Sequence, residues 1–321
     1  GTAGHRIGRT VTDSSNGKDG VAQNRTTRTF VMDGATERLA TKRDIVNSGI
    51  NGRGDAGRQE ITTYITDGTG LDDDAHLQLV NFQVMTNRKY DSSRNVMNQM
   101  ILTYTEKDGT LLDVQEVRSE KFHSSGVALQ QTIVTYSDLS KAEILDVKII
   151  DNSEIEPNGN VKTVTITRYS TAVIADEGKG DITYSGLLDQ QVIKTKATDF
   201  DRRGNALVQD IVRYYYGEED IKILSESQRI TNTFDFQDRA LTSTILNYDD
   251  KGLFTQSQYI TYSSYDKYGN VLSQTINSYS TEEVSADNLI DHKVITNVYA
   301  DADAARRGNA TQTTVVRYDS L

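Results

Sequence analysis

Apolar and polar positions alternate along most of this chain, and the alternation keeps one register relative to nine aromatic residues. A period of two is typical of β-strands. Three positions before the aromatic, seven of the nine segments have Ile and one has Val. We predict that this Ile column forms the core. The closing aromatics are Phe30, Tyr64, Tyr104, Tyr136, Tyr169, Tyr214, Tyr248, Tyr279 and Tyr318, and the column is Ile61, Ile101, Ile133, Ile166, Ile211, Ile245, Ile276 and Val315.

A glycine lies ten residues before the aromatic in seven of the nine segments, and Ala or Val always lies eight residues before it. Glycine at a fixed place before a strand predicts a tight turn with a positive φ. The two departures are Arg94 and Asp238. Gln recurs five positions before the aromatic and predicts a ladder of side-chain amides beside the Ile column. The turn glycines are Gly20, Gly54, Gly126, Gly159, Gly204, Gly269 and Gly308, and the glutamines are Gln59, Gln99, Gln131, Gln209 and Gln274.

A second strand precedes each turn and opens on an apolar pair such as Leu187-Leu188 or Leu289-Ile290. Each repeat is therefore a strand, a turn and a strand. We predict an all-β fold of tandem two-stranded hairpins, nine repeats of about 36 residues, forming an elongated solenoid or spiralling sheet. Residues 1–321 form a single repeat array in this interpretation. With no polar cap at either end, open ends are expected to join head to tail.

Composition narrows the function. The net charge of −11 argues against nucleic-acid binding, and no apolar run approaches the length of a membrane-spanning helix. The chain has no cysteine, so disulfides and thiol chemistry are excluded. No catalytic or nucleotide-binding motif is present, and the four histidines have no metal-ligand spacing, so we expect no enzyme activity.

The segment Tyr-Asp-x-x-Gly-Asn at Tyr265–Asn270, with its approximate copy at Phe200–Asn205, resembles the YD repeats of the bacterial RHS and teneurin families. The resemblance covers the turn and the following strand of most repeats, and the repeat here is longer than in that family. It implies linked β-hairpins that build shells or surface structures and carry no active site of their own.

Two short segments are candidate binding sites. Arg53-Gly54-Asp55 is an Arg-Gly-Asp tripeptide, but Gly54 is also the turn glycine, which favours a structural role. The loop Asp67–Asp74 gathers acidic residues and glycine, which suits Ca²⁺, and its candidate ligands are Asp67, Asp72, Asp73 and Asp74. A solvated loop is the simpler interpretation, and no other cofactor is expected.

These patterns favour a structural protein of a cell surface or extracellular filament, joined to itself through strand edges. Two alternatives remain. One is an adhesin or carbohydrate-binding module, which would show tyrosines clustered outside the repeat columns, with Tyr215-Tyr216 and Tyr259-Tyr262 as candidates. The other is a shell segment that encloses a cargo, as in the RHS family. The expected partners are other copies and glycans.

Overall fold

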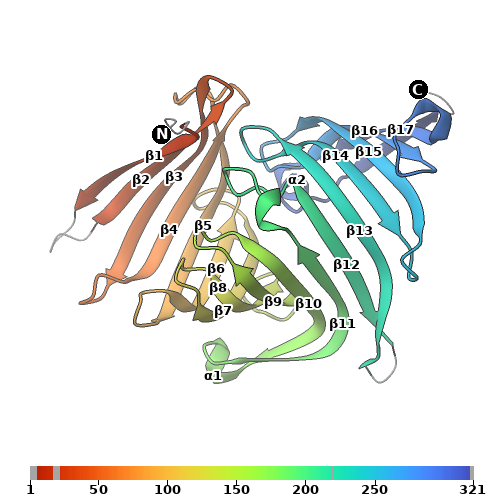
Figure 1. The fold of residues 1–321 in the computed structure, drawn as a ribbon. Helices are drawn as coiled ribbons and strands as arrows, with labels where there is room; N and C mark the ends of the chain where they lie inside the picture. Colours follow the sequence, from red (N-terminus) through yellow and green to blue (C-terminus); the bar gives the residue numbers. More distant parts are fainter. Residues whose placement is uncertain (1–5, 17–21, 218–219, 319–321) are drawn as a thin grey trace, which may run out of the picture. The chain divides into compact units, whose positions relative to one another are not determined.

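The computed structural model describes residues 6–16, 22–217 and 220–318. These residues form eighteen strands in one antiparallel sheet (Figure 1). Strands that follow one another in sequence pair antiparallel, as β1 with β2, β2 with β3, β5 with β6 and β10 with β11. The strands are β1 Gly8–Asn16, β2 Ala22–Asp33, β3 Thr36–Ile50, β4 Ala56–Thr66, β5 Leu77–Tyr90, β6 Val96–Tyr104, β7 Leu111–Phe122, β8 Ala128–Tyr136, β9 Ile144–Ile155, β10 Val161–Ile174, β11 Ile182–Lys194, β12 Val208–Tyr216, β13 Lys222–Phe234, β14 Ala240–Tyr248, β15 Phe254–Tyr265, β16 Val271–Tyr279, β17 Leu289–Val298 and β18 Gln312–Tyr318.

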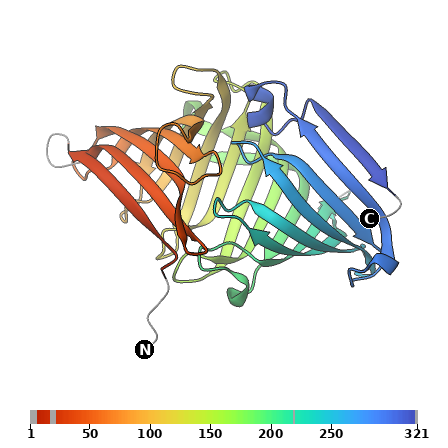
Figure 2. The same cartoon turned by 90° about the horizontal axis from the view of Figure 1, so that it is seen from above.

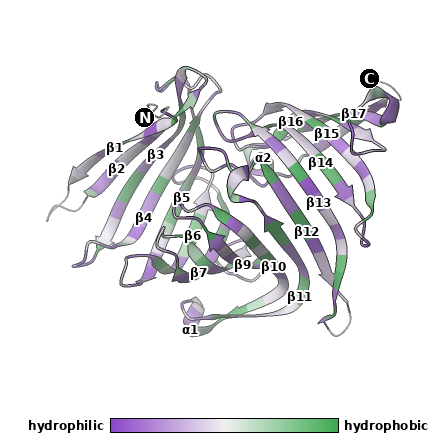
Figure 3. Cartoon of the chain, in the orientation of Figure 1, coloured by the Kyte–Doolittle hydropathy of each residue, from purple (hydrophilic) through white to green (hydrophobic). Residues whose placement is uncertain are grey.

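The eighteen strands are the nine predicted hairpins, so the all-β repeat fold is confirmed. The strands β6, β8, β14 and β16 each begin at the Ala or Val of the repeat and end at its closing aromatic. Hydrophobic and hydrophilic bands alternate along the strands, as the period of two requires (Figure 3).

The sheet divides into two compact units. The first contains residues 1–117, 135–143 and 235–239, and the second contains 118–134, 144–234 and 240–321. Within each unit, strands that follow one another in sequence lie side by side, which is visible for β1–β5 and for β11–β17 (Figures 1 and 2).

A β-bulge lies where six of the hairpins meet the next one. The register shifts just before the closing aromatic at Phe30, Tyr64, Tyr169, Tyr214, Tyr248 and Tyr279. At Tyr169, for example, Arg168 pairs with Asp189 and Tyr169 with Leu187, which leaves Leu188 as the extra residue. Two residues of the next strand therefore face one residue of the earlier strand. This geometry explains the adjacent apolar pairs, which a strict alternation would not contain.

The Ile column is not the most buried column. Of its members only Ile211, 7% exposed, belongs to the buried core, and Val315 is 50% exposed. The position two residues before the closing aromatic, on the opposite face, is more deeply buried: Leu102 is 9% exposed and Val134 is 0% exposed. Val84 lies opposite Leu102 and is buried with it. Alternation separates two faces, but what packs over each face decides which one is buried.

Four short segments depart from strand. The segment α1 (Ala175–Gly178) is the tip of the β10–β11 hairpin, and its Asp176 and Glu177 have positive φ, so it is a turn rather than a true helix. The 3₁₀ segments are η2 (Ala197–Asp199) and η4 (Ala286–Asn288). The helix α2 (Ala302–Arg306) replaces the predicted turn of repeat nine, and Gly308 follows its C-terminus with φ of 69°.

Candidate functional site

The predicted turns share one local geometry. In the turn Asp266–Asn270, the N–H of Gly269 donates to the carbonyl of Asp266, and the N–H of Asp266 donates to the carbonyl of Asn270. This is a type I turn closed by a left-handed residue. The predicted positive φ is confirmed at every described turn glycine, and Gly20 lies outside the described residues. The values are Gly54 84°, Gly126 87°, Gly159 94°, Gly204 96°, Gly269 88° and Gly308 69°, with Arg94 at 70° and Asp238 at 62°.

The Asp and Asn of the Tyr-Asp-x-x-Gly-Asn motif close this turn with their side chains. Asp266 Oδ1 accepts from the N–H groups of Tyr268 and Asn270 at 2.8 and 2.9 Å, and Asn270 Nδ2 donates to Asp266 Oδ2 at 2.8 Å. The same pair forms at Asp201 and Asn205. The motif therefore encodes a ring of hydrogen bonds within the turn, and Asn270 Nδ2 also donates to the carbonyl of Ala305 in the next repeat.

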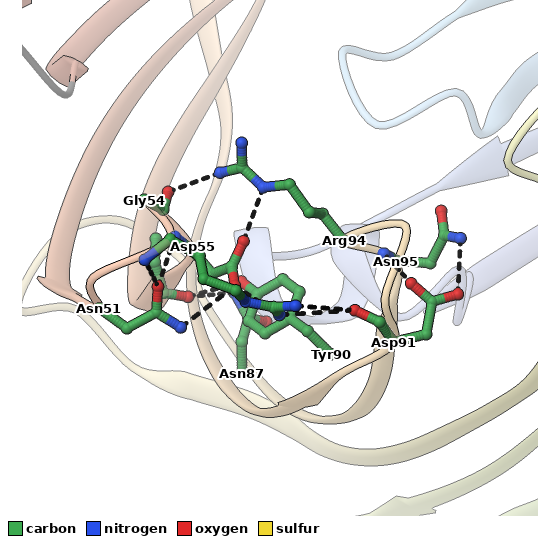
Figure 4. Close-up of polar contacts among 10 residues, drawn as sticks. Asn51, Gly54, Asp55, Asn87, Tyr90, Asp91, Arg94 and Asn95 are labelled. Atoms are coloured by element: carbon green, nitrogen blue, oxygen red, sulfur yellow. Dashed lines mark hydrogen bonds and ion pairs between the residues drawn. The ribbon is translucent and has the colours of Figure 1, made fainter.

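An ion pair between Arg94 and Asp55 joins the turns of repeats two and three (Figure 4). Arg94, which stands where glycine is usual, donates from Nε to Asp55 Oδ1 at 2.7 Å and from Nη2 to the Gly54 carbonyl at 2.8 Å. Asn51 Nδ2 and Arg53 Nε also donate to Asp55, at 3.1 and 3.0 Å. These contacts, Asn51 first, lower the pKa of Asp55, whose side chain is only 1% exposed.

The repeat pattern identifies Arg94 as a departure but does not connect it to Asp55. A signal was present: Asp55 stands where Asn follows the turn glycine in four other repeats, and Asp55 and Arg94 have opposite charge in consecutive repeats. The Arg-Gly-Asp tripeptide is thus explained by the fold. Its carboxylate is engaged within the protein and is not presented to a partner.

A ladder of side-chain amides runs beside the Ile column across β3–β6. Gln59 Nε2 donates to Asn47 Oδ1 at 2.9 Å, Asn87 Nδ2 to Gln59 Oε1 at 3.2 Å, and Gln99 Nε2 to Asn87 Oδ1 at 2.6 Å. The predicted ladder is present here with asparagines between the glutamines. Outside it, Gln131 donates to Ser119 Oγ instead.

The same asparagines tie each hairpin to the one before it. Asn87 Nδ2 and the hydroxyl of Tyr90 both donate to the carbonyl of Ala56, at 3.0 and 2.6 Å. Equivalent donors recur along the chain: Asn47 to Ala22, Asn152 to Ala128, Tyr265 to Ala240 and Asn297 to Val271. The small Ala or Val of the repeat leaves its carbonyl accessible to these side chains.

The four acidic candidates of the Asp67–Asp74 loop point to different partners. Asp67 Oδ2 lies 2.9 Å from His76 Nδ1, and its Oδ1 accepts from Thr69. Asp72 accepts from Arg28 at 3.3 Å, and Asp73 caps the N–H groups of Ala75 and His76. Asp74 is exposed. Across residues 6–16, 22–217 and 220–318, no three His, Cys, Asp or Glu side chains are placed to hold a metal ion.

The Asp67–His76 pair makes this loop pH-sensitive. The hydrogen bond with His76 is the main cause that lowers the pKa of Asp67 to about 2, and the same bond raises the pKa of His76 above its ordinary 6.5. The raised His76 pKa stabilises the fold below pH 6.5, and this contribution is lost as the pH rises through the folded value. The lowered Asp67 pKa stabilises it above pH 3.8, and this contribution is lost as the pH falls toward 2.

We therefore expect the loop to be most stable between pH 3.8 and pH 6.5. In a histidine NMR titration, His76 should titrate above 6.5, and Asp67→Asn should return it to about that value. Asp72→Asn is the control, because Asp72 binds Arg28 and should leave the titration of His76 unchanged. An unshifted His76 in the wild-type chain would contradict the pair.

Within the described residues, the register of β18 is with β17, and all seven residues of β18 are exposed, including Val316 at 43% and Tyr318 at 49%. The strand β1 likewise pairs with β2, and most of its residues are exposed. A strand edge presents unpaired N–H and C=O groups, so both are places where a further strand can add. Separately, the described helices include none long and apolar enough to cross a membrane.

The fold and its turns define a protein of tandem β-hairpin repeats. No protein-family model matches the sequence, and no curated protein matches it. Among solved structures, the chain is similar to the crystal structure of TcdB2-TccC3 without its hypervariable C-terminal region, at 10% identity and a TM-score of 0.17. The similarity covers 91% of this chain and 21% of that one, so the chain spans about a fifth of its length. Neither value places the chain in a family.

Proposed function

We propose that this chain is a non-enzymatic scaffold whose sheet is extended by strand addition at its free edges. The observation that supports this most is the contrast between β18 and internal strands. Val316 is 43% exposed, whereas Leu102 and Val134, at the same position of internal repeats, are 9% and 0% exposed. The edge strand β18 is therefore less enclosed at this position than the internal strands β6 and β8.

The direction of the strands favours joining of copies end to end. Neighbouring strands alternate in direction along the sheet, so β1 of one copy placed beside β18 of another would be antiparallel to it, as β17 is. The alternation of the repeat would then continue without interruption, and heterologous contacts of this kind build fibres when they do not close.

We also propose that this chain has no enzyme activity. The two buried carboxylates of the described residues bind cations of the same chain: Asp55 binds Arg94, and Glu116 binds Arg88 and Lys141. A location at the cell surface or outside the cell is also proposed. It rests on the resemblance of the turn motif to YD repeats, and fractionation of cells that express the protein would test it.

The main test is assembly of the purified chain. We expect sedimentation velocity to show concentration-dependent association, and negative-stain electron microscopy to show elongated particles with an axial repeat. Val316→Lys should block association, because a charge on an edge strand opposes strand pairing. Val46→Lys is the control, because Val46 is 44% exposed, as Val316 is at 43%, but it lies on β3 and pairs with Asn24 of β2 and with Glu60 of β4. A monodisperse monomer at high concentration would refute joining between copies.

A further inference from the structure

The hairpin β10–β11 extends beyond the repeat. Its first strand continues from the closing aromatic Tyr169 to Ile174, and its second begins at Ile182. Insertions of this kind lie outside the packing that the repeat requires, and in repeat proteins they frequently carry binding. The extension adds Tyr184, which belongs to no repeat column and is 42% exposed.

Tyr184 lies against a repeat aromatic. Its ring centroid is 4.5 Å from that of Tyr169, and the ring planes are tilted by 47°. Burial raises the pKa of Tyr169, and the neighbouring Tyr184 and Tyr216 raise it further. Tyr216 is two residues from Tyr214 on β12, so the side chains of these two tyrosines are on one face.

A fourth ring lies on the same face of the sheet. Thr167 pairs with Gln190, and Gln190 with Tyr214, so these side chains form a row on the face that also carries Tyr169. Gln190 Nε2 donates to Thr167 Oγ1 at 3.0 Å, and Gln190 Oε1 accepts from Lys222 Nζ at 2.6 Å. The Lys222 ammonium lies 3.9 Å from the centroid of the Tyr214 ring, so its charge is already engaged.

The exposed ring carries its own hydrogen-bonding group. A tyrosine ring presents an aromatic face, which packs against C–H groups, and a phenol oxygen, which donates and accepts hydrogen bonds. A sugar ring has the matching combination of C–H faces and hydroxyl edges.

We propose that the tyrosine face, defined as Tyr169, Tyr184, Tyr214 and Tyr216, binds a neutral saccharide chain. The sugar rings stack on Tyr184 and Tyr169, and their hydroxyls bind the phenol oxygens. This site is independent of strand addition at β18, and its test uses different variants.

The test is affinity electrophoresis of the full chain in gels that contain hydroxyethyl cellulose, glycol chitin or dextran. We expect at least one polysaccharide to retard the wild-type chain. Since the chain has 17 Tyr and no Trp, binding should also change its tyrosine fluorescence. Tyr184→Ala should weaken retardation at least about tenfold, which corresponds to about 1.4 kcal/mol. Tyr184→Phe should retain most of it because the ring remains.

Tyr215→Ala is the matched control. Tyr215 is 48% exposed on the same strand as Tyr214 and Tyr216, but its side chain is on the opposite face. It should bind like the wild type. The proposal fails if none of the three polysaccharides retards the wild-type chain, if Tyr184→Ala is retarded equally, or if Tyr215→Ala loses as much as Tyr184→Ala. Tyr184→Phe separates loss of the ring from loss of folding, because it preserves packing.

Discussion

Replacing Glu116 by alanine is expected to lower the free energy of unfolding by about 3–5 kcal/mol, the typical loss when one partner of a buried ion pair is removed. The Glu116 side chain is 0% exposed in β7. Arg88 of β5 binds it with both terminal nitrogens, at 2.7 and 3.0 Å, and Lys141 Nζ lies 2.7 Å from Oε1. Arg88 and Lys141 are themselves only 17% and 24% exposed, so alanine removes a negative charge from the side of two enclosed cations.

Urea unfolding followed by circular dichroism would measure this loss. Glu120→Ala is the control, because Glu120 is exposed on the same strand and its removal should change stability by no more than about 0.5 kcal/mol. Glu116→Gln keeps the volume of the side chain and should lie between the two. If Glu116→Ala and Glu120→Ala unfold at the same urea concentration, the cluster does not stabilise the first compact unit.

The second large effect is expected when the residue three positions before the closing aromatic is replaced by Asp. The replacement is compared in a buried strand and in the exposed strand β18. Ile211→Asp should lower the free energy of unfolding by at least about 3 kcal/mol, because it places a carboxylate where the side chain is 7% exposed and no cation is paired to it. Val315→Asp changes the same column of repeat nine, where the side chain is 50% exposed on the edge strand β18. There the carboxylate stays hydrated, and a loss of about 0.5 kcal/mol or less is expected.

Chemical unfolding and native-state hydrogen exchange of the two variants would measure both effects. Hydrogen exchange also shows whether Ile211→Asp opens only β11–β13 or the whole second unit, since repeat arrays can open locally. Equal losses in the two variants would mean that the column, rather than its surroundings, determines the contribution of each side chain. A fully stable Ile211→Asp would place the core on the other face.

The local features of this fold follow from its sequence. The turn at Asp266–Asn270 is closed by hydrogen bonds among five consecutive residues, so its motif predicts its shape wherever it occurs. The left-handed position is occupied by glycine in most repeats, and its geometry is kept when Arg94 or Asp238 replaces glycine. The bounds of the strands also follow from the sequence, because β6 and β16 each begin at the Val of the repeat and end at its closing aromatic. These features depend on neighbours in the chain, which the sequence displays directly.

Other features are decided by residues that meet only when strands pair. The sequence shows Leu187-Leu188 as an apolar pair, but only the register opposite Tyr169 reveals the bulge that accommodates it. Repeat nine keeps Gly308-Asn309 but has Ala304-Ala305 where repeat eight has Tyr265-Asp266, and it forms the helix α2, with Asp301 capping its N-terminus.

The sequence by itself determined the repeat, its nine hairpins and the shape of its turns, because these rest on alternation and on short-range hydrogen bonds. Only the tertiary structure decided which face is buried, that Asp55 binds Arg94, that Glu116 gathers two cations, and that Tyr184 lies on Tyr169. Each of these joins residues on different strands. Such contacts depend on the register between strands and on what covers each face, and neither is encoded in a single repeat.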